Sequence, residues 1–164
     1  MKTTSAYANK LIKGYREELS ALDNLERETC TTTYGVNETP IESDYYFLAM
    51  QVKIDSLNDK IAKLRHAVNV FNTTTMLDDL GYTIDEALVR MAMLSEKKQR
   101  LSRMKAIREL SRRSGGFHGE AELTKRNFNA DDAGAEFQKT AGELTQLQLA
   151  LDRANMSIEF EVEL

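Results

Sequence analysis

The fold is decided by residues 43–72, which read SDYYFLAMQVKIDSLNDKIAKLRHAVNVFN. Apolar side chains recur in this stretch at alternating steps of three and four, at Phe47, Met50, Ile54, Leu57, Ile61, Leu64, Val68 and Phe71. This spacing is an unbroken heptad seam and predicts a helix over about residues 42–72. Its start has two alternative signals: a capping box at residues 39–42 with Pro40 at the first helical position, or Ser43 as a later cap.

A second amphipathic helix is predicted before it, over about residues 5–30. Its apolar side chains lie on one side, at Ala8, Leu11, Tyr15, Leu19, Leu22 and Leu25. Residues 31–38 are polar, β-branched and contain a glycine, which indicates a loop. The two helices are therefore expected to pair as an αα-hairpin.

Two more helices follow, over about residues 83–114 and 131–155. Thr83 and Glu86 form a capping box for the first of them. The second has a heptad seam of its own, at Phe137, Thr140, Leu144, Leu147, Leu151 and Ala154. Either Asn129 or Asp131 is available to cap it.

Short strands are expected in two places. Residues 121–128 have no helical period and allow a strand, whereas residues 157–164 alternate strictly between apolar and acidic side chains. The alternation predicts that four side chains face the protein: Ile158, Phe160, Val162 and Leu164. An isolated strand is unstable, and a straight helix of about 24 residues separates the two segments by roughly 36 Å. We therefore predict that the terminal strand pairs with residues 121–128 of another subunit.

These elements predict an all-α fold, a single helical domain over residues 1–164. Four long antiparallel amphipathic helices, with short C-terminal strands, pack either as an up-down bundle or as coiled-coil hairpins. One proline, no tryptophan and eight glycines suit long helices better than a turn-rich β protein. Because helices this long leave apolar stripes uncovered in a slim bundle, we expect a dimer or larger homo-oligomer.

Composition restricts the compartment and the partners. The net charge of −4 disfavours recruitment of nucleic acid or of an anionic membrane by the molecule as a whole. No apolar run approaches the roughly 20 residues of a membrane span, and none at the N-terminus resembles a signal peptide. Cys30 is the only cysteine, which excludes an intrachain disulfide and fits a reducing compartment. We expect a cytoplasmic protein with no membrane association.

Four segments carry a resemblance to a known family: AYANK at residues 6–10, KLRHAVNVFNTT at 63–74, YTIDEAL at 82–88, and LQLALDRAN at 147–155 followed by FEV at 160–162. On these segments the chain resembles a bacterial family of small helical proteins of unknown function, some of which are called septicolysin-like. The resemblance extends over most of the chain. It implies a helical fold and a cytoplasmic protein, and it brings no activity or catalytic residues.

One charged segment stands out, in the second half of the helix predicted over residues 83–114. It holds eight basic residues: Lys97, Lys98, Arg100, Arg103, Lys105, Arg108, Arg112 and Arg113. Such a cluster can bind phosphates. The favoured interpretation is a solvated face whose charge suits the helix C-terminus and meets acidic neighbours, because no aromatic residue is interleaved within it.

No catalytic or metal-binding pattern is present. His66 and His118 lack ligands at a zinc-type spacing, and Cys30 has no histidine near it in sequence. The pairs at residues 78–79 and 131–132 do not follow a calcium-loop pattern and are interpreted as loop and helix-start residues. The polar run at residues 69–75 can form a pocket, but helix-end hydrogen bonds are favoured. No cofactor, metal ion or catalytic residue is predicted.

Three classes of function remain. The first is a structural or protein-interaction oligomer without catalytic activity, which binds itself or other proteins; the heptads favour it. The second is a nucleic-acid-associated protein that uses the basic segment. The third is an enzyme or a small-ligand-binding bundle.

Overall fold

The computed structural model describes residues 1–77, 80–113, 119 and 121–164. Four helices contain more than half of the chain: α1 (Ser5–Thr29), α2 (Phe47–Thr74), α3 (Ile84–Lys105) and α4 (Ala130–Ser157). The strands of the described part are short and form three antiparallel pairs: β1 (Lys2–Thr4) with β6 (Glu159–Glu161), β2 (Met76–Leu77) with β3 (Tyr82–Thr83), and β4 (Leu110–Arg113) with β5 (Glu122–Lys125). The prediction of a mainly helical chain with four helices is confirmed.

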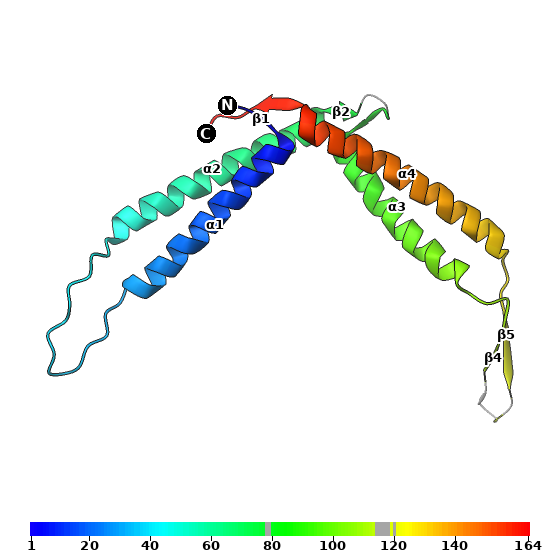
Figure 1. Ribbon diagram of the computed structural model, residues 1–164, viewed down its shortest axis with the longest axis horizontal. Coiled ribbons are helices and arrows are strands. Elements are labelled where there is room, and N and C mark those ends of the chain that lie inside the picture. Colours follow the sequence, from blue (N-terminus) through cyan, green and yellow to red (C-terminus); the bar gives the residue numbers. More distant parts are fainter. Residues whose placement is uncertain (78–79, 114–118, 120) are drawn as a thin grey trace. The chain divides into compact units, whose positions relative to one another are not determined.

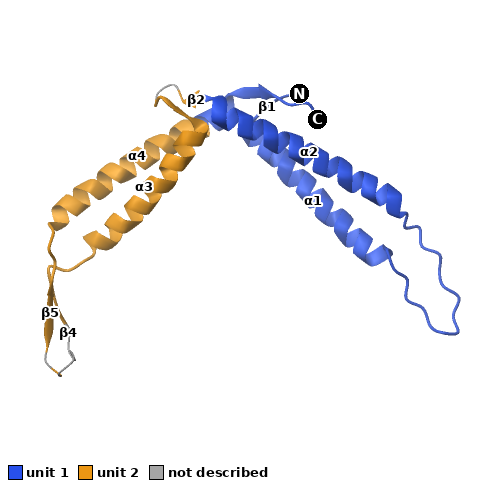
Figure 2. Cartoon of the chain, turned by 180° about the vertical axis from the view of Figure 1, so that it is seen from behind, with its two compact units in different colours: residues 1–75, 153–164 blue, residues 76–152 orange. Residues whose placement is uncertain are grey.

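The chain divides into two compact units, residues 1–75 with 153–164, and residues 76–152 (Figure 2). The prediction of one domain over residues 1–164 stays a prediction.

The first unit is built on the pair α1 and α2, which lie side by side in Figure 1. Its core is a cluster of buried side chains from both helices and from the segment after β6: Ala8, Ile12, Ile61, Leu64 and Val162. Leu64 is fully buried. Farther along the pair, Lys60 lies over the ring of Tyr15, with Nζ 5.5 Å from the centroid. The predicted heptad seam of α2 therefore forms the core contact of this hairpin.

The second unit is built on α3 and the part of α4 that precedes residue 153, again side by side in Figure 1. The capping box at the start of α3 is present as predicted. The N–H of Glu86 donates to Oγ1 of Thr83, and the N–H of Thr83 donates to the Glu86 carboxylate. Among the two candidates for capping α4, Asn129 is the one used, since its Oδ1 accepts from the N–H of Asp131 at 2.9 Å.

Helix α2 begins at Phe47, and both predicted starts are wrong. The side chain of Ser43 accepts from the N–H of Tyr45 and donates to the carbonyl of Thr29 at the end of α1. These contacts hold the chain extended against α1, so Tyr46 becomes the residue before the helix. The first seam residue, Phe47, is consequently exposed rather than buried.

Helix α3 ends at Lys105, so the predicted end at residue 114 is also wrong. Ile107 and Leu110, apolar residues within the range predicted for this helix, are exposed, and a helix without a covered apolar face gains little from extension. The chain instead pairs β4 with β5 in the register Leu110↔Lys125. The strand expected within residues 121–128 exists as β5, but its partner is β4 and not the C-terminal strand.

The C-terminal strand is shorter than predicted and pairs within the chain. Helix α4 continues to Ser157, and only Glu159–Glu161 form β6. Its partner is β1, with Thr3 opposite Phe160. Residues 2–4 were not predicted as a strand. The prediction of intersubunit pairing with residues 121–128 was therefore wrong.

Candidate functional site

The basic segment predicted on one helix is divided between a helix and a strand. Five of its residues lie on α3: Lys97, Lys98, Arg100, Arg103 and Lys105. Arg108 lies in the connection that follows α3, and Arg112 and Arg113 lie on β4. The eight residues therefore do not share one helical face.

Lys97 is engaged by helix α4. Its ammonium group donates a hydrogen bond to Oε1 of Glu136 and forms an ion pair with that carboxylate. The hydrogen bond and the positive charge together hold the pKa of Glu136 below its ordinary value. For this lysine, the prediction that an acidic neighbour meets the basic segment is confirmed.

Two further lysines lie over an aromatic ring of α4. The Nζ atoms of Lys105 and Lys98 are 4.8 Å and 5.9 Å from the centroid of Phe137, so both are within the range of a cation–π contact. No aromatic residue is interleaved with these cations along residues 97–113, so the contact with Phe137 was not predicted. Phe137 reaches the segment from the antiparallel helix. Phe137 was already on the predicted seam of that helix.

Arg100 and Arg103 lie beside a surface hollow of about 590 Å³. Lys97 and Met93 also line it. Arg126, just after β5, is used structurally: its guanidinium donates to the carbonyls of Ile107 and Phe128. The two arginines on α3 share their hollow with the carboxylate of Glu96.

The C-terminal segment was predicted to face the protein at alternate positions, and this holds for two of the four residues. Val162 belongs to the core of the first unit, and the ring of Phe160 stacks on Phe71 with centroids 4.7 Å apart. Ile158, before the strand, and Leu164, three residues after it, are exposed.

A groove of about 450 Å³ runs beside this segment. Residues 158–163 form one wall, and a flank of α2 that includes Ala67, Val70 and Phe71 forms the other. The α2 wall includes Val70, Phe71, Thr74 and Thr75 of the polar run for which a pocket was the alternative interpretation, whereas the other wall, about 90 positions later in the sequence, was not predicted.

A polar cluster joins α1 to the start of α2. The hydroxyl of Tyr45 donates to Oε1 of Glu26 at 2.6 Å, and Nε2 of Gln51 donates to the same oxygen at 3.0 Å. The hydrogen bond to the carboxylate is the main cause that raises the pKa of Tyr45 to about 12. Cys30 is exposed and lines a surface hollow together with Glu26, Tyr45 and Gln51. A phenol held protonated in this way is a weak acid and serves as a hydrogen-bond donor that fixes the helix ends.

The remaining candidate residues do not assemble into a site. His118 and the pair at residues 78–79 lie outside the described residues. His66 is exposed on α2, where it lines the groove. Within the described ranges, no group of three or more His, Cys, Asp or Glu side chains is arranged to hold a metal ion.

The polar run at residues 69–75 closes the end of α2, as favoured. The hydroxyl of Thr74 donates to the carbonyl of Val70 at 2.7 Å, and that of Thr73 donates to the carbonyls of Asn69 and Val70. The carbonyls of Asn69 and Val70 also accept from the backbone one turn later in α2, so these hydroxyls add back-bonds within the last turns of the helix.

No family model matches the chain, and no curated protein matches it. One solved structure that is similar is the crystal structure of a functionally unknown conserved protein from Corynebacterium diphtheriae, with a TM-score of 0.64 and 19% sequence identity over 98% of this chain and 100% of that one. At this identity the similarity supports the fold alone. No helix in the described part of the chain is long and apolar enough to cross a membrane.

Proposed function

We propose that the protein is a non-catalytic, cytoplasmic helical scaffold that associates with itself through the start of α2. Self-association extends the expectation drawn from the heptads. Membership of the septicolysin-like family, suggested by the segments quoted above, is part of the same proposal.

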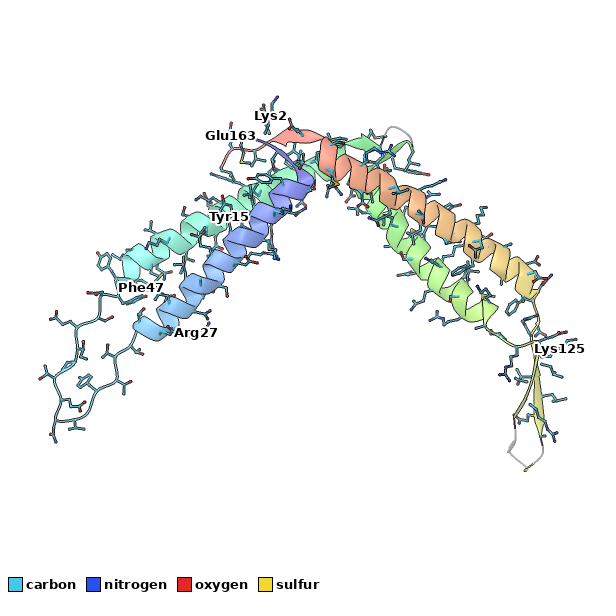
Figure 3. The ribbon with its side chains drawn as sticks, viewed as in Figure 1. Lys2, Tyr15, Arg27, Phe47, Lys125 and Glu163 are labelled. Atoms are coloured by element: carbon cyan, nitrogen blue, oxygen red, sulfur yellow. The ribbon has the colours of Figure 1, made fainter. Side chains whose placement is uncertain are left out.

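The observation that supports it is a surface that we call the α2 patch, made of Phe47, Leu48 and Val52. Their exposed fractions are 57%, 61% and 69%, values that are ordinary for lysine and unusual for three large apolar residues on two turns of helix. Leu48 and Val52 are four residues apart and so lie on the same face. Figure 3 shows Phe47 at the start of α2. A second copy of the same patch would cover these side chains in a self-complementary contact.

The test is the mass of the protein in solution, measured by light scattering coupled to size exclusion. We expect a mass at least twice the 18.6 kDa of one chain, and we expect Val52→Glu to reduce it toward that value. Leu149→Glu is the matched control, because Leu149 on α4 is exposed to a similar extent, at 58%. A monomeric wild-type protein would contradict the proposal, and so would equal effects of the two substitutions.

A second candidate function is supported by Arg100 and Arg103 beside their surface hollow. Two arginines one helical turn apart are suited to hold phosphate oxygens. If the protein binds nucleic acid there, affinity for a DNA duplex will fall steeply as salt rises. The variant Arg100→Gln will then reduce both the affinity and the salt slope. Absence of salt-dependent binding would eliminate this candidate.

A further inference from the structure

Strand β6 has one paired edge and one open edge. Its partner β1 occupies one side, and within the described residues the sheet consists of these two strands. The N–H of Val162 donates to the carbonyl of Met1 at 2.9 Å, so Met1 and Val162 form a hydrogen-bonded pair of the antiparallel ladder. Because the hydrogen-bonding direction alternates along a strand, the N–H and C=O of Glu161 point to the open edge. A further strand can be added there.

The open edge borders an apolar groove. The groove of about 450 Å³ lies between residues 158–163 and α2, and its volume is in the range of sites that hold ligands. The stacked rings of Phe71 and Phe160 line it, together with Ala67. Val70 extends into the same wall and is almost half exposed. Apolar side chains of an added strand would therefore be buried against the apolar wall of this groove.

The charge along the open edge of β6 determines which side chains an added strand must carry. Three exposed carboxylates follow one another at alternate positions: Glu159, Glu161 and Glu163. Basic side chains nearby are Lys63 and His66 on the α2 wall and Lys2, which lies opposite Glu161 on β1. A second copy of β6 would place glutamates against glutamates, which is unfavourable across a ladder. A strand with lysine or arginine at alternate positions would instead match them.

We propose that the open edge of β6 binds an extended basic segment of a partner protein by strand addition. The backbone of Glu161 pairs with the segment, cationic side chains face the three glutamates, and the intervening apolar side chains enter the groove against α2. This surface is separate in sequence from the α2 patch, so the proposal does not depend on self-association.

The experiment uses the full chain and a synthetic peptide of alternating residues, KVKVKVK. Hydrogen exchange of the Glu161 amide is followed by nuclear magnetic resonance. At saturating peptide we expect this exchange to slow by roughly tenfold or more, because the amide becomes a ladder donor. Affinity, measured by fluorescence anisotropy, should weaken as salt rises because the charges are exposed. Unchanged exchange at Glu161 overturns the proposal.

Matched variants and peptides separate strand addition from simple attraction. Glu161→Lys should weaken binding by roughly tenfold, whereas Asp55→Lys, with the same charge change at an exposed position of α2, should leave it near the wild-type value. In an antiparallel ladder the residue opposite Glu161 has its side chain on the same face and is therefore a lysine, so a peptide N-methylated on its lysines keeps its charge and loses the hydrogen bonds to β6. If it binds the wild-type protein as tightly as KVKVKVK, the proposal fails. It also fails if Glu161 becomes protected with rising protein concentration in the absence of peptide, since a second copy would then occupy the edge.

Discussion

Replacing Leu64 by alanine tests whether the α2 seam forms the core of the first unit. Leu64 is fully buried in the cluster that also contains Ile12 and Val162. The change removes three carbon groups, and at about 0.8 kcal/mol for each the transfer loss is about 2.4 kcal/mol. The cavity left in the cluster raises the expected cost to about 3–4 kcal/mol.

Urea unfolding followed by far-ultraviolet circular dichroism measures this loss. Leu149→Ala is the control, because Leu149 lies outside the α2 patch, is 58% exposed and should change the free energy of unfolding by less than about 0.5 kcal/mol. Oligomeric state is matched by comparing the variants at equal protein concentration. A Leu64→Ala variant as stable as the wild type, or a Leu149→Ala variant that loses as much as Leu64→Ala, would refute the placement of the seam.

Three further predictions concern individual hydrogen bonds. Thr83→Ala removes the capping box of α3 and should cost about 1 kcal/mol in urea unfolding, whereas Thr83→Ser should retain most of it. The pKa of Tyr45, read from its ring carbon resonance, should be about 12 and fall toward the ordinary value in Glu26→Gln. Because this pKa is raised in the folded state, the protonated Tyr45 stabilises the folded protein below pH 10. This stabilisation is lost between about pH 10 and 12. Lys97→Met should raise the lowered pKa of Glu136. In the wild type, the ionised Glu136 stabilises the folded protein above the ordinary pKa of glutamate, and this stabilisation is lost as the pH falls through the lowered pKa of the folded state. The Lys97→Met variant should therefore lose less stability on acidification than the wild type.

The interiors of the helices were predictable because their signal is local. Met50, Leu57, Ile61, Leu64 and Phe71 are all buried, as the alternation of three and four requires. The capping box at Thr83 was predictable for the same reason, since both partners lie within one helical turn.

Two helix ends were not predictable, the start of α2 and the end of α3, because contacts distant in sequence determine them. Pro40 and Ser43 are both residues that often begin a helix. The hydroxyl of Ser43 instead donates a hydrogen bond to the carbonyl of Thr29, and α2 begins at Phe47. Lys105 ends α3 where the covered seam ends, and the side chain of Arg126 then binds the carbonyl of Ile107. Thr29 and Arg126 are too far along the sequence from the helix ends they affect to be included in a local pattern.

The composition of the basic segment could be predicted from the sequence, but its secondary structure could not. The sequence correctly located eight cations but placed Arg112 and Arg113 on a helix. Their pairing with β5 depends on a ladder whose second strand begins at Glu122. Likewise the groove beside β6 exists only because β1 draws the C-terminal segment back to the start of α1.

The position of Val162 in the first unit has a consequence during synthesis. Helices α1 and α2 are complete by residue 74, but the cluster around Leu64 also requires a side chain that is made 88 positions later. At about 5–20 residues per second the ribosome adds those positions in roughly 4–18 s. The nascent hairpin therefore emerges with one apolar side of its core still uncovered, and a chaperone that shields such surfaces has that interval in which to act.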